Sequence, residues 1–278
     1  ATNVAKYDAN DKKWSNIGAP SLPGDANVIY KKSVPNSVLD KSVRVVHVAG
    51  KGFYKLYNTN DKTWTDATPE GFTGKFEAIE YDSEFFTTDR VFLAGEFNFT
   101  INTAKTDYCT NVCEYNRQTK QWSKLLPADK APNKIVKDLK LIGDKLYMVG
   151  EFTNTGTPGI ATVSTKGASA LQAATSSDNV VSANDEELRS IDVCSKTDLY
   201  CKEGSMIVGS KDALLKFYDS SAKAWVNFGE VDHPFSDNDE RRVNSVLTWN
   251  YIGAASASTV FGISSAFVMF AALIAMLF

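Results

Sequence analysis

The sequence predicts an all-β chain made of repeated four-stranded units and followed by one hydrophobic C-terminal helix. Three observations support this class. A tyrosine and a tryptophan seven residues apart recur four times along the chain, and a short apolar segment that ends in glycine also recurs four times. Residues 251–278 contain no charged side chain.

The composition is that of a folded protein with few catalytic options. Of the 278 residues, 43% are hydrophobic and 23% are charged, which is typical of a globular chain. The net charge of −3 provides no basic field for a phosphate backbone, so we expect no nucleic-acid partner. With only two histidines, His47 and His233, the sequence predicts no enzyme, no cofactor and no metal site.

The aromatic repeat predicts four β-hairpins. In each copy an Asp or Asn follows the tyrosine, and a lysine stands two residues before the tryptophan. A hairpin centred between residues seven apart places them opposite each other on neighbouring strands, so each pair should form a cross-strand aromatic contact. We interpret these side chains as packing residues between sheets: Tyr7 with Trp14, Tyr57 with Trp64, Tyr115 with Trp122, and Tyr218 with Trp225.

The glycine-ended segments predict a second strand in each unit. They finish at Gly50, Gly95, Gly150 and Gly209, and two of them continue as Gly-Glu-Phe. Glu96 and Glu151 follow the glycine directly; they are either ligand-facing acceptors or solvated turn residues. A third apolar stretch recurs at 76–81, 135–142, 188–193 and 243–249 and completes four strands per unit.

The spacing of the units predicts a β-propeller. Successive tyrosines of the repeat are 50, 58 and 103 residues apart, and the long step contains a degenerate copy at 159–173 without the Tyr and Trp. Four strands repeating every 40 to 50 residues are typical of propeller blades. We expect about five four-stranded blades in residues 1–249, with the first hairpin, 4–18, and the last strand, 243–249, sharing one blade.

These segments resemble the repeats of kelch-type propellers, which have a glycine-ended strand followed by Tyr and then Trp. The Gly-Glu-Phe variant with a hydrophobic tail is most similar to the membrane-anchored propeller ectodomain of fungal cortical polarity markers used in bud-site selection. The double glycine of kelch repeats is Ala-Gly or Val-Gly here. The resemblance implies a binding scaffold, and nothing in the chain resembles the ligand set of the kelch-related copper oxidase or a sialidase arginine cluster.

The C-terminal segment predicts a membrane anchor. Residues 260–278 form an apolar run that as a helix would be roughly 28 Å long, close to the thickness of the bilayer hydrocarbon. Either it is a transmembrane helix, whose Gly262, Ser264 and Ser265 could face partner helices, or it is a signal for a glycolipid anchor attached near 253–256. Residues 250–259 would form a linker of small residues.

Cysteines and a sequon favour the extracellular or luminal side of the membrane. We expect two local disulfides, Cys109 with Cys113 and Cys194 with Cys201, the latter pair facing each other across a hairpin because it is also seven apart. Asn98-Phe99-Thr100 is a candidate glycosylation site. The basic pair at 241–242 favours the alternative, a cytoplasmic tail-anchored domain.

Together these features predict a non-enzymatic, membrane-anchored scaffold that binds proteins or glycans through one propeller face. Two alternatives remain open at this point. One is an accessory subunit of a larger membrane complex, and the other is a propeller-type glycan hydrolase or oxidase.

Overall fold

The computed structural model describes residues 5–8, 11–17, 22–31, 45–82, 90–101, 106–154, 159–167, 170–174, 187–195, 202–210 and 214–230. The predicted strand 243–249, linker 250–259 and anchor 260–278 lie outside these ranges. Among the residues that are described, no helix is long and apolar enough to span a membrane. The chain divides into an N-terminal unit, residues 1–178, and a C-terminal unit, residues 179–278.

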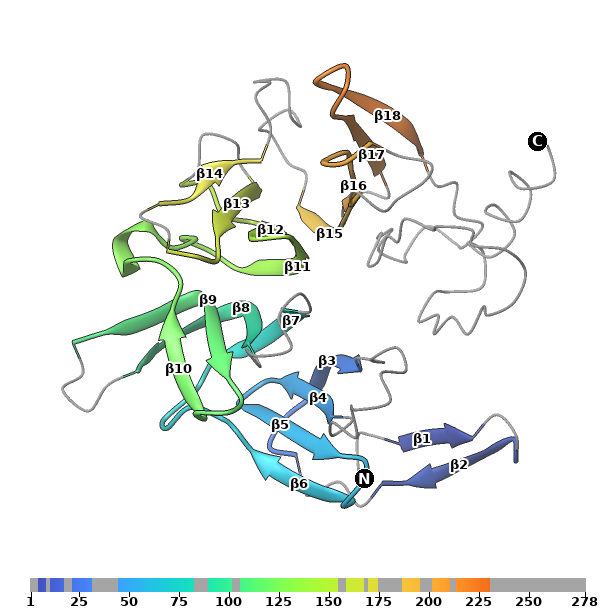
Figure 1. Cartoon of the computed structure of the whole chain (residues 1–278), viewed down its shortest axis with the longest axis vertical. Coiled ribbons are helices and arrows are strands. Elements are labelled where there is room, and N and C mark those ends of the chain that lie inside the picture. Colours follow the sequence, from blue (N-terminus) through green and yellow to red (C-terminus); the bar gives the residue numbers. More distant parts are fainter. Residues whose placement is uncertain are drawn as a thin grey trace, which may run out of the picture. The chain divides into compact units, whose positions relative to one another are not determined.

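The described structure is all-β, as predicted, with four four-stranded antiparallel sheets and one two-stranded hairpin (Figure 1). In the N-terminal unit the elements are β1 (Ala5–Asp8), β2 (Lys13–Asn16), β3 (Ala26–Lys31), β4 (Val45–Gly50), β5 (Phe53–Asn58), β6 (Thr63–Asp66), β7 (Lys75–Tyr81), β8 (Arg90–Thr100), β9 (Tyr108–Asn116), β10 (Gln121–Lys124), the 3-10 turn η1 (Ala128–Lys130), β11 (Val136–Ile142), β12 (Lys145–Gly150), β13 (Ile160–Ser164) and β14 (Gln172–Ala173). The C-terminal unit contains β15 (Leu188–Val193), β16 (Met206–Ser210), β17 (Leu214–Asp219) and β18 (Ala224–Glu230). In every four-stranded sheet the strands pair in chain order.

The predicted register of the aromatic repeat is confirmed. All four tyrosines pair directly with their tryptophans across a hairpin. Where both side chains are described, the ring centroids are 5.0 Å apart for Tyr57 with Trp64, 5.0 Å for Tyr115 with Trp122, and 5.3 Å for Tyr218 with Trp225. Contacts at this distance are typical of attractive aromatic pairs.

The polar residues of the repeat build the turn between the paired strands. The Asp or Asn after the tyrosine accepts hydrogen bonds from two backbone N–H groups of the turn: Asn58 from Asn60 and Asp61, Asn116 from Gln118 and Thr119, and Asp219 from Ser221 and Ala222. The lysine that ends each turn has a left-handed backbone, with φ of 52° at Lys12, 56° at Lys62, 57° at Lys120 and 51° at Lys223. The repeat thus specifies a turn of constant length as well as an aromatic pair.

The glycines at the strand ends are required by a neighbouring backbone. In each sheet the first strand has a register shift at the same place, opposite the end of the second strand. A Cβ on Gly50, Gly95 or Gly150 would lie well inside van der Waals contact of a carbonyl oxygen at the start of that first strand or in the residue just before it. One prediction was wrong here. In the fourth sheet Ser210 holds this position and Gly209 corresponds to Ala49, so the apparent glycine alignment is displaced by one residue.

Among the other strands, one was missed and one expected hairpin is confirmed. The first strand of the first full sheet, β3, was not predicted. In the degenerate unit, β13 and β14 do form the expected hairpin, in which Ala161 pairs with Ala173. Val163 occupies the place of the tyrosine because it pairs with Leu146 as Tyr57 pairs with Val46.

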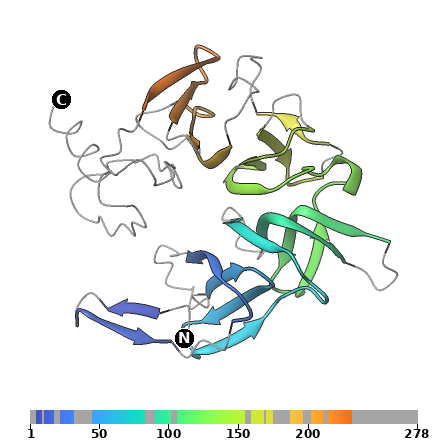
Figure 2. The ribbon, with the colours of Figure 1, turned by 180° about the vertical axis from the view of Figure 1, so that it is seen from behind.

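The three full sheets of the N-terminal unit pack face to face on two hydrophobic cores (Figures 1 and 2). One core lies between sheet β3–β6 and sheet β7–β10 and is rich in aromatic residues, including Tyr54, Phe76 and Tyr115. The other lies between sheet β7–β10 and sheet β11–β14 and is mainly aliphatic. Strand β8 contributes Val91 and Leu93 to the first core and Phe92 and Ala94 to the second, so the middle sheet is buried on both faces.

Hydrogen bonds of the tryptophans repeat from one unit to the next. The indole N–H of Trp122 donates to the carbonyl of Ala67 at 3.1 Å, and that of Trp64 donates to the carbonyl of Ile17 at 3.4 Å. Each acceptor stands three residues after the preceding tryptophan of the repeat. The tryptophans therefore link consecutive units in addition to filling the space beside them.

Candidate binding face

The ends of the three sheets differ in how their strands are connected. We call the end of the sheets at which Gly50, Gly95 and Gly150 lie, on β4, β8 and β12, the glycine end, and the opposite end the turn end. At the turn end the Tyr–Trp hairpins have turns of equal length, between β1 and β2, β5 and β6, and β9 and β10. The other connections at this end differ in length: 32–44, 82–89, 143–144 and 165–171. At the glycine end the links between the second and third strands differ in every sheet: 51–52, 101–107 and 151–159.

The two predicted glutamates lie at the glycine end, in the first position after the glycine. Glu96 is exposed, with 65% of its side chain accessible, and Glu151 is 38% accessible. Both are ion-paired with a lysine of the adjacent first strand. Lys75 lies 3.4 Å from Glu96 and 3.2 Å from Glu77, and Lys137 lies 3.4 Å from Glu151.

These pairs change the character of the face. Burial alone would lower the pKa of Lys75, but the hydrogen bond and charge of Glu77, together with Glu96, outweigh it and raise the pKa above its usual value. The carboxylates are thus matched by cations within ion-pair distance. The glycine end presents paired charges rather than a ring of uncompensated acceptors.

Strands β8 and β9 extend beyond the rest of their sheet at the glycine end and form an arm, whose described residues are 96–101 and 106–111 (Figure 1). The arm has two unlike faces. On its inner face Phe97, Phe99 and Cys109 are 5%, 5% and 0% exposed and belong to the aromatic core. On its outer face Asn98 and Tyr108 are exposed.

The Cys109–Cys113 disulfide is present, as predicted, and lies within strand β9. The two Cα atoms are 5.8 Å apart, whereas four residues of extended strand would span about 13 Å. The chain is bent between them at Asn111, whose φ of 56° is left-handed. The disulfide therefore holds a kink at the base of the arm.

Asn111 connects this kink to the rest of the unit. Its side-chain oxygen accepts the backbone N–H of Phe97 at 2.9 Å, and its amide nitrogen donates to the carbonyls of Pro132 at 2.8 Å and Lys134 at 3.1 Å. The residue is 7% exposed. Hydrogen bonds in such a setting are costly to remove, since the partners stay buried.

The neighbouring loops of the glycine end are fixed in the same way. Asn154 donates to the carbonyl of Ala131 at 2.6 Å. Asn133 accepts the backbone N–H of Thr153 at 2.8 Å and donates to its hydroxyl at 3.1 Å. Sequence reasoning did not find this asparagine network, because Asn in loops is common and its partners lie 20 or more residues away.

Arg90 was also missed and joins two sheets. It forms a bidentate pair with Glu114 at 2.9 and 2.7 Å, donates to the carbonyl of Thr165 at 2.7 Å, and lies 3.5 Å from Asp82. Because Thr165 follows β13, this guanidinium ties sheet β7–β10 to sheet β11–β14. It lies at the turn end and has a structural role.

His47 lies in the interior, away from the candidate face. Its Nδ1 is 2.7 Å from the hydroxyl of Tyr54, and its ring also contacts Tyr81. Burial, with a smaller contribution from the charge of Arg117, lowers the pKa of His47 from 6.5 to about 3. Burial likewise raises the pKa of Tyr54 well above its usual value. The pair is a neutral part of the core.

The second predicted disulfide is placed only in part. Cys194 is disulfide-bonded, and its expected partner Cys201 lies outside the described residues. The expectation that the two face each other directly across a hairpin was wrong. The backbone N–H of Cys194 donates to the carbonyl of Ser205, and Val193 pairs with Met206, so Ser205 is the residue opposite Cys194. Within the described part of the chain, no three His, Cys, Asp or Glu side chains gather as a metal site would require.

No protein-family model and no curated protein sequence matches this chain. Among solved structures, the extracellular domain of a putative one-component system from B. thetaiotaomicron is similar to it, with 11% sequence identity and a TM-score of 0.48. The similarity covers 78% of this chain and 24% of that one, so this chain spans about a quarter of the length of its structural neighbour. A likeness of this size indicates neither a family nor a function.

Proposed function

We propose that this chain is a non-enzymatic scaffold, anchored to a membrane by residues 260–278, that binds proteins or glycans through the glycine end on the extracellular or luminal side. The observation that carries the proposal is the arm of β8 and β9, which extends beyond its sheet at the glycine end and has exposed side chains on its outer face. The Cys109–Cys113 disulfide and the buried Asn111 hold the base of the arm in place. An ordered projection of this kind on a rigid scaffold is typical of binding sites.

The proposal includes the finer architecture, a kelch-type β-propeller of about five blades in which the termini share one. It is supported by the four four-stranded sheets and by the indole hydrogen bonds that recur from unit to unit. Trp14 is 72% exposed in the N-terminal unit. In a closed ring it would be covered by a neighbouring blade, and Trp14→Ala would then destabilise the protein as much as Trp64→Ala does. A Trp14→Ala variant as stable as the wild type would contradict closure.

Oxidation of Cys109, Cys113 and Cys194 supports the extracellular or luminal side, since stable disulfides are rare in the cytosol. The non-enzymatic character is supported by the use made of the repeat residues. Their aromatic rings pack and their Asn and Asp side chains cap turns.

The binding role can be tested by capture with the full chain in detergent. We expect the immobilised protein to retain a discrete protein or glycan from solubilised membrane and wall material. Glu96→Lys reverses an exposed charge at the glycine end and should reduce capture. Asp61→Lys makes the same change at the turn end and should not. Failure of the wild type to retain any component, or equal loss in both variants, would contradict the proposal.

The size of the particle separates the scaffold from the accessory-subunit alternative. A scaffold should leave the membrane in mild detergent as a small species. An accessory subunit should elute in one large stable complex with fixed stoichiometry.

A further inference from the structure

We infer that Asn98 carries an N-linked glycan and that its first sugar packs on the ring of Tyr108. The inference rests on the proposed extracellular or luminal placement, but not on the binding role. Asn98 begins the sequon Asn98-Phe99-Thr100 on strand β8, within the arm. A sequon accepts a glycan in the folded protein only where the asparagine is on the surface.

The alternation of the strand places Asn98 on the surface. Along β8, Phe97 and Phe99 point into the aromatic core, while Glu96 and Asn98 are exposed. Because successive side chains of a strand point to opposite faces, a glycan on Asn98 would leave the packing of Phe97 and Phe99 unchanged.

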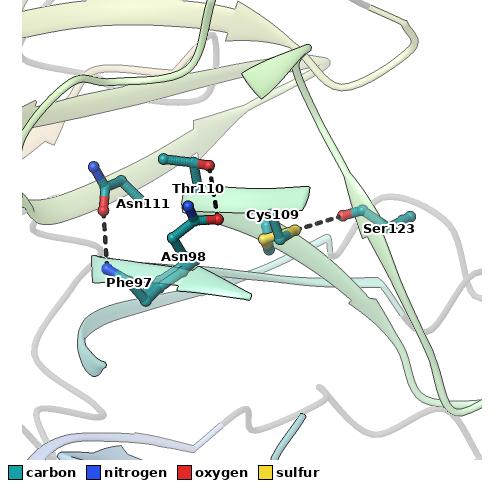
Figure 3. Close-up of a disulfide and its surroundings, with 7 residues drawn as sticks. Phe97, Asn98, Cys109, Thr110, Asn111 and Ser123 are labelled. Atoms are coloured by element: carbon teal, nitrogen blue, oxygen red, sulfur yellow. Dashed lines mark hydrogen bonds between the residues drawn. A yellow bond between two sulfur atoms is a disulfide. The ribbon is translucent and has the colours of Figure 1, made fainter. Parts of the chain in front are cut away.

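The orientation of the amide suits glycan attachment. Thr110, paired with Asn98 in the ladder, donates its hydroxyl to the Asn98 side-chain oxygen at 3.4 Å (Figure 3). N-linked sugars are attached to the amide nitrogen, which keeps one hydrogen, and the oxygen remains an acceptor. The Thr110 contact is therefore compatible with the glycan, because it uses only the oxygen of the amide.

Tyr108 lies where the first sugar would rest. Thr100 pairs with Tyr108 and Asn98 pairs with Thr110, so Tyr108 is a diagonal neighbour of Asn98 on the outer face. Diagonal residues of paired strands are about 7–8 Å apart, within reach of an aromatic ring. Its 39% exposure is unusual among the large apolar side chains of the described residues. An aromatic ring offers an apolar, electron-rich face to the C–H groups of a sugar.

The nearby asparagines do not compete for the modification. Two residues after Asn111, Asn133 and Asn154 stand a Cys, an Ile and a Gly, respectively, so none of the three asparagines begins a Ser/Thr sequon. All three are instead engaged in the hydrogen bonds of the glycine end.

The modification is tested on the full chain produced through the secretory pathway of a eukaryotic cell. Endoglycosidase treatment should increase the electrophoretic mobility of the wild type by one glycan, and mass spectrometry should locate that glycan on Asn98. Asn98→Gln and Thr100→Ala should abolish the shift, while Thr100→Ser should preserve it. A wild type without the shift, or a shift that survives Asn98→Gln, would overturn the inference.

A reporter separates this failure from failure of the proposed placement. Asp61→Asn creates an Asn-Lys-Thr sequon at an exposed position of the turn between β5 and β6. A glycosylated reporter with an unmodified Asn98 would overturn the inference alone. If neither asparagine were modified, the extracellular or luminal placement, and the inference that rests on it, would both fall.

The role of Tyr108 has its own readout. Tyr108→Ala should lower the Tm of the glycosylated protein but not that of the enzymatically deglycosylated protein. Tyr108→Phe keeps the aromatic ring and should leave the Tm of both forms at the wild-type value. An equal change in both forms would show that Tyr108 only supports the fold, and would overturn the stacking contact.

Discussion

Replacing Asn111 tests whether the arm is held rigid by its own hydrogen bonds. Asn111→Gly keeps the left-handed backbone, for which φ is 56°, and removes the side chain. Three hydrogen bonds are lost, one accepted from Phe97 and two donated to Pro132 and Lys134. The backbone N–H of Phe97 then remains buried without its acceptor.

The expected cost follows from these three contacts. A buried donor left unsatisfied costs about 1–3 kcal/mol, and each of the two carbonyl contacts contributes about 0.5–1.5 kcal/mol net. Asn111→Gly should therefore lower the free energy of unfolding by about 2–6 kcal/mol. Asn111→Ala should cost roughly 1 kcal/mol more, because alanine is strained in the left-handed region.

Hydrogen exchange provides the local measurement and denaturant unfolding the global one. In Asn111→Gly the Phe97 amide should exchange at least tenfold faster than in the wild type, since 1.4 kcal/mol corresponds to about a factor of ten. Asn133→Gly is the control, because its hydrogen bonds to Thr153 are exposed and should be worth less. Unchanged exchange at Phe97 and a stability within about 0.5 kcal/mol of the wild type would refute the reasoning.

Three further predictions concern the frame of the fold. The pKa of His47 is about 3 in the folded protein and about 6.5 in the unfolded one, so its contribution to stability is complete above pH 7 and decreases as the pH falls. Relative to His47→Gln, the wild type should lose about 3 kcal/mol of unfolding free energy between pH 7 and pH 4. Curves of unfolding free energy against pH that run parallel for the two proteins would contradict this. Gly95→Ala places a Cβ against the backbone of β7 and should lower the free energy of unfolding by about 3 kcal/mol, measured with denaturant. In the control Gly143→Ala the new Cβ has no atom within 4 Å, and only the left-handed φ of 58° should cost about 1 kcal/mol. Lys120→Gly relieves a left-handed lysine and should raise stability by roughly 0.5–1 kcal/mol, seen as a higher Tm; a lower Tm would show that the lysine side chain stabilises the turn.

The hairpins could be predicted from the sequence because their determinants are local. A Tyr, an Asx, a left-handed residue and a Trp within eight positions define both the turn and the register, and the structure has these pairs as predicted. Strand β3 was missed for the opposite reason. It is separated from its partner β4 by residues 32–44, so no neighbouring strand in the sequence marked it as part of a sheet.

The displaced glycine shows what a motif cannot reveal. Gly209 looks like Gly50 in the sequence, yet glycine is needed only where a neighbouring carbonyl approaches the Cα, and that depends on the bulge in another strand. Ser210 occupies the corresponding position in the fourth sheet. Cys194 illustrates the same limit, since a spacing of seven did not make Cys201 its opposite residue.

The arm could be predicted only in its covalent features. Its disulfide and sequon are short motifs, but its supports are long-range: the Asn111 side chain bonds to carbonyls 21 and 23 positions away and to the Phe97 amide 14 positions away. No single-sequence pattern encodes which loop will lie beside a given side chain. The stabilising contacts of the candidate face are therefore visible only in the folded chain.

The supports of the arm explain how it could serve as a recognition element. A two-stranded ribbon is marginally stable by itself. Here Phe97 and Phe99 pack the inner face of the arm into the aromatic core, and the Cys109–Cys113 disulfide closes its base. An ion pair between Lys124 on β10 and Asp107, which precedes β9, joins the arm to the neighbouring strand. A ribbon held in this way has little conformational entropy left to lose on binding, so a ligand need not order it. The same reasoning implies that loosening the kink should weaken binding even when no residue that contacts the ligand has changed.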